Sequence, residues 1–271
     1  MPRDVTAPTL GKNGKPLSKS ALKLRKIKRL KCSIKFEKLA WASGAQLVAG
    51  VDEVGRGSLF GPVVAAAVIL EPSYRVKGLR DSKLLDADTR EELDKRIREH
   101  AVAIGIAAVD ANDIDELNIY HASRLAMCRA VMQLNPAPDH LLIDAMRIDH
   151  DCPQTKIIYG DAQSISIAAA SIVAKVYRDA MFTQWEEQYP GYDLRSNKGY
   201  RSPKHIAALR DLGPTELHRR SFAPAWSKSV VASDDFANEL SALEEDGVEL
   251  TPVQRAQMRA RGWYRTAAAS L

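Results

Sequence analysis

Four carboxylates lie at the ends of predicted strands in this chain. Asp52 and Glu53 come after one apolar run, Asp144 directly follows a second, and Asp161 follows a third. In an α/β sheet the ends of neighbouring strands meet at one crevice, where ligands bind. Converging carboxylates repel one another unless hard cations neutralise them, and oxygen ligands without a Cys or His cluster indicate Mg²⁺ or Mn²⁺. Two such ions ~4 Å apart would activate a water and stabilise the departing oxygen in phosphodiester cleavage.

Each acid also has a plain structural interpretation, because strand-end aspartates often cap the helix or turn that follows. The fourfold recurrence favours a functional role over capping. Asp52 and Glu53 add a geometric requirement, since neighbours in a regular strand face opposite sides. Both reach one site only if the strand is bulged or twisted there, or if it ends at Glu53 and the turn Gly55–Gly57 redirects it.

Length and composition exclude several classes of protein. The chain has 271 residues and is 45% hydrophobic, which allows one large domain with extensions or two small ones. No apolar run approaches the ~20 residues that span a bilayer. The basic N-terminus lacks a secretory apolar segment, which indicates a cytoplasmic protein. Three widely spaced cysteines form no CxxC pair, which argues against structural zinc and a disulfide framework.

The positive charge is concentrated at the N-terminus. Residues 1–38 contain twelve Lys or Arg against Asp4 and Glu37, whereas the whole chain has a net charge of only +5. The rest of the chain is therefore net acidic, and the basic residues form an attached arm. Such an arm suits a polyanion through salt-dependent attraction to phosphates, and a solvated basic tail is an equally good interpretation.

Hydrophobic patterning predicts alternating strands and helices. The expected strands lie at about residues 47–53, 63–70 and 101–109, with two short ones within 140–146 and 155–161. The expected helices lie at about residues 85–97, 113–134 and 166–188, with helical pieces in 191–226. Outside this body, a basic helix is expected over about residues 20–39, an acidic one within 233–250, and a short one from Thr251 towards Trp263.

The opening strand pair carries a resemblance to a known family. The stretch GVDEVGRGSLFGPVVAAAVIL, residues 50–70, closely resembles the signature opening of ribonuclease HII, a type 2 ribonuclease H. The resemblance covers about residues 46–228 in family order and leaves out the basic arm and the C-terminal part. Its further matches are Asp81–Leu84, Asp115–Ile119, Leu142–Asp144, Gly160-Asp161, Ala169–Ile172, Ala174-Lys175, Lys198–Tyr200 and His218–Phe222.

The resemblance implies a fold and an activity. The fold is a ribonuclease H-like mixed five-stranded sheet flanked by helices, with a helical C-terminal part. The activity is endonucleolytic hydrolysis of the RNA strand of RNA–DNA hybrids, and cutting 5′ to a lone ribonucleotide in duplex DNA, which leaves 3′-hydroxyl and 5′-phosphate ends. Residues at the family's catalytic and metal-binding positions are Asp52, Glu53, Asp144 and Asp161, with Mg²⁺ or Mn²⁺ as the cofactor.

The resemblance also implies substrate-binding residues. The turn Gly55-Arg56-Gly57 matches the element that recognises the ribose 2′-hydroxyl, and glycines let a backbone approach a sugar closely. Tyr200 matches a tyrosine that stacks on the deoxyribose after the ribonucleotide, and Lys83 matches a lysine near substrate phosphate. Taken alone, these residues read as an ordinary turn, a packed tyrosine and a solvated lysine.

Other matching positions have less defined roles. Ser171 and Lys175 are similar to a family pair that supports the site, and the segment His218–Arg220 either contacts phosphate or closes the domain. The chain departs from the family pattern where Ala145 follows Asp144 in place of a glycine. It departs again where Arg201–Pro203 follows Tyr200, since the family has proline and then threonine there.

The domain prediction is a basic arm at residues 1–45, a catalytic domain at 46–228 and a helical extension at 229–271. The family implies a monomer without membrane contact that acts in ribonucleotide excision repair and DNA replication. Two other readings stay open from the residues: a nucleic-acid-binding protein that kept the fold, and another nuclease of the same fold. The presence of all four acids argues against a binding protein without activity. The Gly-Arg-Gly turn and Tyr200 argue against another nuclease of the same fold.

Overall fold

A mixed five-stranded sheet forms the centre of the computed structural model, which describes residues 18, 22, 25, 27, 29–73, 78, 79 and 85–222. The strand order is β3-β2-β1-β4-β5; β1 pairs antiparallel with β2 and parallel with β4. This confirms the predicted ribonuclease H-like architecture. The strands are β1 (Val48–Val54), β2 (Val63–Leu70), β3 (Ala101–Val109), β4 (His140–Asp144) and β5 (Gln154–Ile157).

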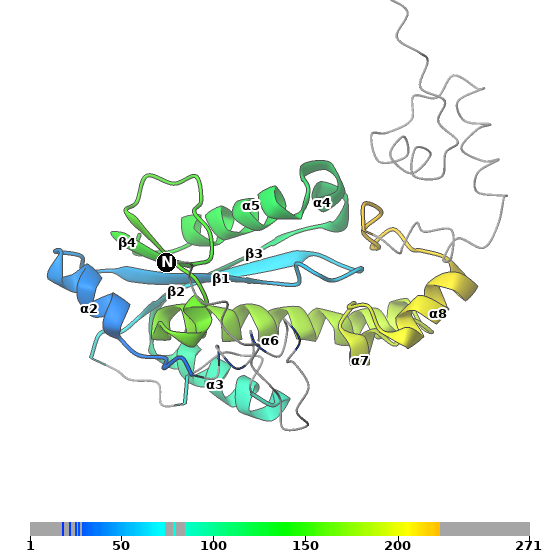
Figure 1. Cartoon of the computed structure of the whole chain (residues 1–271), viewed down its shortest axis with the longest axis horizontal. Helices are drawn as coiled ribbons and strands as arrows, with labels where there is room; N and C mark the ends of the chain where they lie inside the picture. Colours follow the sequence, from blue (N-terminus) through cyan, green and yellow to red (C-terminus); the bar gives the residue numbers. More distant parts are fainter. Residues whose placement is uncertain are drawn as a thin grey trace, which may run out of the picture.

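Helices cover both faces of the sheet (Figure 1). One face carries α5, and the opposite face carries α6 and α3, while α7 and α8 extend beyond the end of the sheet where the β1–β2 hairpin lies. The helices are α2 (Lys35–Ala42), α3 (Ala87–His100), α4 (Ala111–Leu117), α5 (Ile119–Met132), α6 (Ile165–Gln188), α7 (Leu194–Asn197) and α8 (Pro203–Leu212), with a 3₁₀ turn η2 (Gly160–Ala162) before α6.

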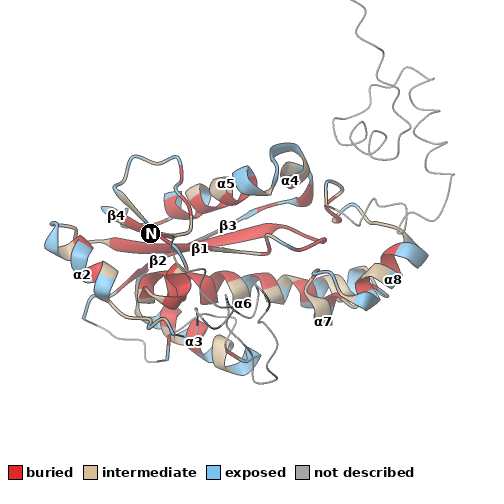
Figure 2. Ribbon diagram, in the orientation of Figure 1, coloured by how far each residue is buried: buried red, intermediate tan, exposed pale blue. Residues whose placement is uncertain are grey.

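Strand β2 is buried along its whole length because it contributes to two cores (Figure 2). Val63, Ala65 and Ala67 pack in the cluster that includes α5, whereas Val64 and Ala66 pack in the cluster that includes α3 and α6. This alternation is the period-two pattern of a strand covered on both faces, which explains its continuous apolar sequence.

The first turn of helix α6 packs directly against the backbone of β1. A Cβ atom on Gly50 would lie 2.0 Å from the backbone carbon of Ser166 and 2.4 Å from the nitrogen of Ile167. Any side chain at residue 50 would therefore push the start of α6 away from the sheet. The glycine fixes the N-terminus of α6 against the strand that carries Asp52.

Three local predictions are wrong. The basic helix expected over about residues 20–39 is interrupted, because residues 30–34 are not helical and α2 begins only at Lys35. The helix expected over residues 113–134 is divided into α4 and α5 at Asn118, which has a φ of 66° and whose side chain accepts from the backbone nitrogens of Tyr120 and His121. With a ψ of 161°, this is a strained conformation for a residue other than glycine, and the Asn118 side chain caps the second helix. Asp161 does not end a strand either, because β5 stops at Ile157 and Asp161 lies in the turn η2.

Several expectations concern residues outside the described part of the chain. These are most of the basic arm, the loop that contains Lys83, and the C-terminal helices expected within 233–263. The domain boundaries at residues 45 and 228 stay predictions. Inside the arm, α2 packs against β1 and β4, with Ala40 buried beside Val48 and Leu142.

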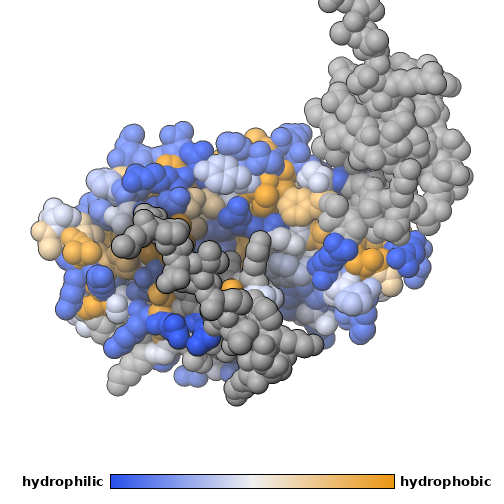
Figure 3. All heavy atoms as spheres, in the orientation of Figure 1, coloured by the Kyte–Doolittle hydropathy of each residue, from blue (hydrophilic) through white to orange (hydrophobic). Residues whose placement is uncertain are grey.

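The surface of the described residues is largely hydrophilic on the face shown in Figure 3. The most exposed large apolar side chains, Leu39, Met132 and Leu212, lie on three different helices. None of the helices among the described residues has the length and apolar character that a membrane crossing needs.

Candidate active site

Asp52 and Asp144 lie side by side at the parallel pairing of β1 and β4. The register pairs Val51 with Ile143, so the next residue on each strand is one of the two acids. Leu142 packs with Ile167 of α6, which places Asp144, two residues further along, on the α6 face of the sheet. Asp52 pairs with Ala66, a member of the same face's core, and is 4% exposed.

The turn that carries Asp161 is tied to Asp144. The backbone nitrogen of Gly160 donates to Asp144 Oδ1 at 2.6 Å. A Cβ on Gly160 would lie 3.3 Å from that oxygen and 2.5 Å from the Ile167 side chain, so glycine permits the approach. Asp161 follows directly and is buried. The contact therefore brings the turn containing the third acid to the end of β4.

Glu53 occupies the opposite face of β1. It pairs with Ala65, which belongs to the core beneath α5, and the pairing of β1 with β2 stays in register there. The structure therefore gives no bulge at the two acids, and the strand does not end at Glu53, because β1 runs to Val54. Burial raises the pKa of Glu53 to about 7, Arg56 opposes this shift, and the negative charge of Asp144 adds to it. The charge of Asp144 acts on Glu53 at the end of β4. No residue of β4 pairs with β1 at Glu53.

The donor atoms fit a hard cation, although the described residues contain no group of three or more His, Cys, Asp or Glu side chains close enough, as placed, to hold a metal ion. Glu53 Oε2 is buried and has no hydrogen-bond partner. An orphaned carboxylate oxygen beside further carboxylates lacks a positive partner, and an all-oxygen set is what Mg²⁺ or Mn²⁺ prefers. A cation would satisfy that oxygen and offset the repulsion.

The turn Gly55–Gly57 follows β1 and is supported from beneath by Arg178. Gly55 has a φ of 93°, and a Cβ there would lie 2.3 Å from Arg178 Nε. Glycine is required both by this backbone conformation and by the guanidinium below it. Arg56 forms an ion pair with Glu53 at 3.3 Å and is partly exposed. Gly57 is exposed at the tip of the turn.

Tyr200 lies beside this turn. It forms an antiparallel bridge with Ser58, and a Cβ on Gly57 would lie 3.9 Å from the Tyr200 ring. The ring is 37% exposed, and the Arg178 guanidinium lies 5.6 Å from its centroid. The structure thus brings together the predicted turn and the predicted tyrosine, 143 residues apart in the chain for Gly57 and Tyr200. Ser202 and Pro203, which depart from the family pattern, cap and begin α8.

Two buried arginines clamp this region, and sequence reasoning missed the first of them. Arg178 Nε, Nη1 and Nη2 donate to the carbonyl oxygens of Pro62, Lys198 and Phe60 at 3.1, 3.0 and 3.2 Å. Arg219 Nε and Nη1 donate to the carbonyls of Gly61 and Arg56 at 2.8 and 3.0 Å. No local signal in the sequence marks Arg178, which follows Lys175 and directly precedes Asp179 in α6. Of the two roles expected for the segment His218–Arg220, the contacts of Arg219 favour closure of the domain, because its buried side chain holds the backbone of Gly61 and Arg56.

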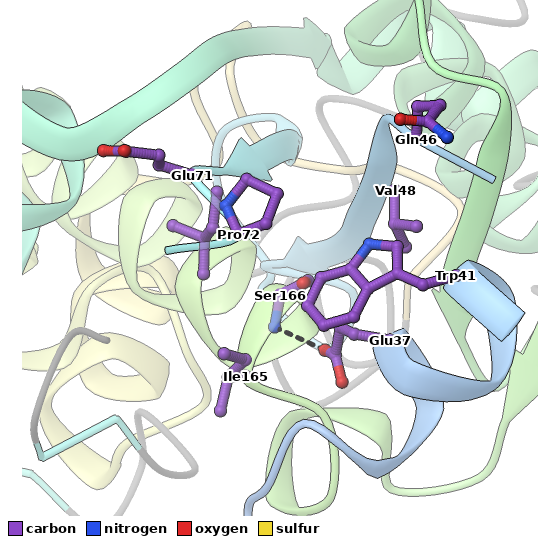
Figure 4. A pocket seen from close by; sticks show the side chains of 9 residues that line it. Glu37, Trp41, Gln46, Val48, Glu71, Pro72, Ile165 and Ser166 are labelled. Carbon is purple, nitrogen blue, oxygen red and sulfur yellow. Dashed lines mark hydrogen bonds between the residues drawn. The ribbon is translucent and has the colours of Figure 1, made fainter. Parts of the chain in front are cut away.

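Glu37 of α2 is a further residue that the sequence did not single out (Figure 4). It is 1% exposed, and its Oε1 accepts from Ser164 Oγ at 2.5 Å and from the backbone nitrogen of Ser166 at 3.0 Å. Ser164 is the N-cap of α6. The carboxylate therefore satisfies orphan donors at a helix start, where the dipole favours a negative charge.

Replacement of Glu37 should separate hydrogen bonding from charge. Glu37→Ala leaves the donors of Ser164 and Ser166 unpaired, so we expect a loss of about 2–3 kcal/mol of unfolding free energy. Glu37→Gln keeps an accepting oxygen and should lose only the charge–dipole contribution, about 0.3–1 kcal/mol. Urea unfolding of both variants measures this, and equal losses would contradict the hydrogen-bonding role.

The remaining predicted residues are placed less directly. Ser171 is buried on α6, and Lys175 forms an ion pair with Asp179 at 2.6 Å on the same helix. Ala145 adopts a φ of 52°, which shows why the family has glycine after the aspartate: the left-handed conformation costs an alanine about 1–2 kcal/mol. Lys83 lies outside the described residues.

Comparison with known proteins gives one consistent result. The family model for ribonuclease HII matches residues 49–225. The ribonuclease HII of Koribacter versatilis (strain Ellin345) is 67% identical over 230 residues, which cover 85% of this chain and 91% of the relative.

Solved structures share the fold. The ribonuclease H2 of Pyrococcus horikoshii OT3 has a TM-score of 0.59 at 25% identity, covering 66% of this chain and 95% of its own. Bst-RNase HIII, crystallised in complex with Mn²⁺, has a TM-score of 0.55 at 19% identity, covering 80% of this chain and 74% of its own. The family model and the curated relative show that the chain belongs to the ribonuclease HII family and is a ribonuclease H.

Proposed function

We propose that the chain cuts RNA in RNA–DNA hybrids, and cuts 5′ to single ribonucleotides in duplex DNA, with Asp52, Glu53, Asp144 and Asp161 as the ligands of two Mg²⁺ or Mn²⁺ ions. The observation that carries the metal assignment is the juxtaposition of Asp52 and Asp144 at the ends of neighbouring parallel strands. The unpartnered, buried Glu53 Oε2 supports it. Such ions, when bound, supply an activated water and stabilise the departing 3′ oxygen.

The protein's own residues prepare the site. Gly160 N–H donates to Oδ1 of Asp144 and so holds that carboxylate at the end of β4. Ser164 and Glu37 fix the start of α6, three residues after Asp161. The Arg56 guanidinium pairs with Glu53 Oε1 and so restrains the one acid on the far face of β1. Asp144 and Glu53 are thus restrained before any substrate arrives, and so is the start of the helix that follows Asp161, which lowers the cost of ordering the site.

The turn Gly55–Gly57 supplies the selection for RNA in this proposal. Its exposed Gly57 permits close backbone approach to a sugar, and the 2′-hydroxyl distinguishes ribose from deoxyribose. The partly exposed ring of Tyr200 lies next to it and offers an apolar face to the following sugar. Lys83 is proposed to approach substrate phosphate. A monomer acting in the cytoplasm, in ribonucleotide excision repair and replication, follows from this substrate choice and the family.

The test compares three duplexes under the same conditions: an RNA–DNA hybrid, an RNA duplex and a DNA duplex. We expect Mg²⁺-dependent cleavage of the RNA strand of the hybrid, and its loss with EDTA. Cleavage that persists in EDTA would contradict the metal assignment, and equal cleavage of the DNA duplex would contradict the role of the Gly55–Gly57 turn.

The basic arm should add affinity that depends on salt. Removal of residues 1–28 leaves α2 and Glu37 in place and deletes eight Lys or Arg. We expect weaker binding to the hybrid and a shallower slope of log K against log salt concentration, by roughly 0.9 for each phosphate that the arm neutralises in the full chain. Fluorescence anisotropy across salt concentrations measures the slope, and an unchanged slope would show that the arm does not contact substrate.

A further inference from the structure

We propose that His205 and His218 form a neutral hydrogen-bonded relay that holds the backbone of Tyr200 in place, which makes both histidines positioning residues for recognition of the ribonucleotide junction. The relay itself follows from the geometry, and its effect on substrate choice rests on the proposed role of Tyr200. Neither histidine touches the carboxylates described above.

The relay runs through four groups in buried surroundings. His205 Nδ1 lies 3.0 Å from the carbonyl oxygen of Tyr200, and His205 Nε2 lies 3.1 Å from His218 Nε2. His218 Nδ1 accepts from the backbone nitrogen of Thr215 at 2.9 Å. The exposed fractions of His205 and His218 are 0% and 1%, so both imidazoles are shielded from water.

The two ends of the relay determine where its protons lie. The Tyr200 carbonyl can only accept, so His205 Nδ1 must carry a hydrogen. The Thr215 N–H can only donate, so His218 Nδ1 must be bare, and the Thr215 hydroxyl, 2.9 Å from the same nitrogen, then acts as a second donor. A neutral His218 then carries its hydrogen on Nε2 and donates to the bare Nε2 of His205. One proton occupies the space between the rings, and both imidazoles are fully bonded.

A second proton has no place in this arrangement. It would set two N–H groups against each other at 3.1 Å or break the bond from Thr215. Burial lowers the pKa of His218 to about 3 and also lowers that of His205, in agreement with this reasoning. The nearby charges are Asp193, which acts on His205, and Arg220, which acts on His218.

The relay connects the two chain segments that lie on either side of residues 58–60, directly after the Gly55–Gly57 turn. After that turn, Ser58 bridges to Tyr200 on one side, and Phe60 bridges to His218 on the other. The Phe60 and His218 rings also pack edge to face, 4.8 Å between centroids. The imidazole pair therefore fastens the tyrosine segment to the segment that closes the domain, and a shift of one would move the other.

Nuclear magnetic resonance of the full chain, labelled with ¹⁵N on histidine, tests the relay directly. We expect His205 protonated on Nδ1 only, His218 protonated on Nε2 only, and a ¹⁵N–¹⁵N coupling through the hydrogen bond that joins their Nε2 atoms. Both should stay neutral at pH 5, below the ordinary pKa of a histidine side chain. A positive charge on His205 or His218 at that pH, or a hydrogen on His205 Nε2, would overturn the proposed relay.

Cleavage by variants tests the effect on Tyr200. His205→Leu removes the donor to the Tyr200 carbonyl, whereas His205→Asn keeps an N–H near the position of Nδ1. We expect His205→Leu to lower the ratio of kcat/KM for a single-ribonucleotide duplex over that for a hybrid by about tenfold, the effect of removing one buried hydrogen bond. His205→Asn should restore part of the ratio, and His121→Gln should leave it unchanged.

Melting curves show whether each variant is folded, and the ratio is taken on folded protein only. If Tyr200→Ala lowers the ratio and folded His205→Leu does not, the positioning role is wrong. If neither variant changes the ratio, the proposed role of Tyr200 fails, and so does the relay's effect on substrate choice. The resonance measurement then decides the relay by itself.

Discussion

Asp52→Asn protein should fold like the wild type and cut the RNA strand of a hybrid about 10³-fold more slowly. The side chain is 4% exposed and lies next to Asp144, so the amide keeps the shape but removes the negative charge that would bind a cation. Metal ions in such a site stabilise the charge of the transition state by several kcal/mol. Each 1.36 kcal/mol of that stabilisation corresponds to a factor of ten in rate. Single-turnover rates at saturating Mg²⁺ measure the loss.

The same substitution should leave the melting temperature unchanged or raise it when no divalent ion is present. Removing one of two neighbouring carboxylates relieves their repulsion. Asp211→Asn on the exposed end of α8 is the matched control and should keep the wild-type rate. Asp52→Asn protein that cuts at the wild-type rate would remove Asp52 from the catalytic centre.

Arg178→Met should cost about 3–5 kcal/mol of unfolding free energy, because buried carbonyl oxygens that lose a donor cost about 1–3 kcal/mol each. The substitution removes the guanidinium donors from the carbonyl oxygens of Phe60, Pro62 and Lys198. The Phe60 oxygen keeps one donor, the Ser58 hydroxyl at 2.8 Å. It also removes the group against which Gly55 is packed. Hybrid cleavage should therefore fall even at temperatures where the variant is folded, because the turn loses its support.

Urea unfolding measures the stability loss, and Arg195→Met on the exposed α7 is the control, expected to stay within about 0.5 kcal/mol of the wild type. A small loss for Arg178→Met would mean that water replaces the guanidinium at the three carbonyls. Unchanged cleavage by the folded variant would mean that the turn keeps its shape without the clamp.

Helix α6 sets the spacing between the metal-binding acids and the sugar-binding turn. Its start contacts Gly50 at Ser166, and its Arg178 contacts Gly55. Twelve residues of helix rise about 18 Å, and five residues of extended strand rise about 17 Å, so the two elements run alongside each other in step. One helix thereby relates the carboxylates near its N-terminus to the turn near its middle.

The features that sequence predicts well are those encoded locally. The continuous apolar run of β2 and the opposite facing of Asp52 and Glu53 both follow from the period of a strand. Asp144 ends its strand as expected. The motif around Gly55 also pointed to Tyr200, because the family resemblance carried both.

The features that sequence reasoning missed depend on contacts between distant residues. Glu37 reaches Ser164 across 127 positions, and Arg178 reaches Phe60 across 118. Nothing in the local pattern of α2 or α6 distinguishes a buried, hydrogen-bonded charge from a solvated one. The break at Asn118 was missed for another reason: its neighbours have helical patterning, and only the backbone angle of that residue ends the helix.

Cleavage of a DNA duplex that contains one ribonucleotide is the decisive test of the proposed function. With Mg²⁺, we expect a single nick on the 5′ side of the ribonucleotide, with a 3′-hydroxyl on one fragment and a 5′-phosphate on the other, and no cut in the matching all-DNA duplex. End-labelled products resolved at single-nucleotide length give the position. A nick on the 3′ side, or cutting of the all-DNA duplex at a similar rate, would refute the proposed function.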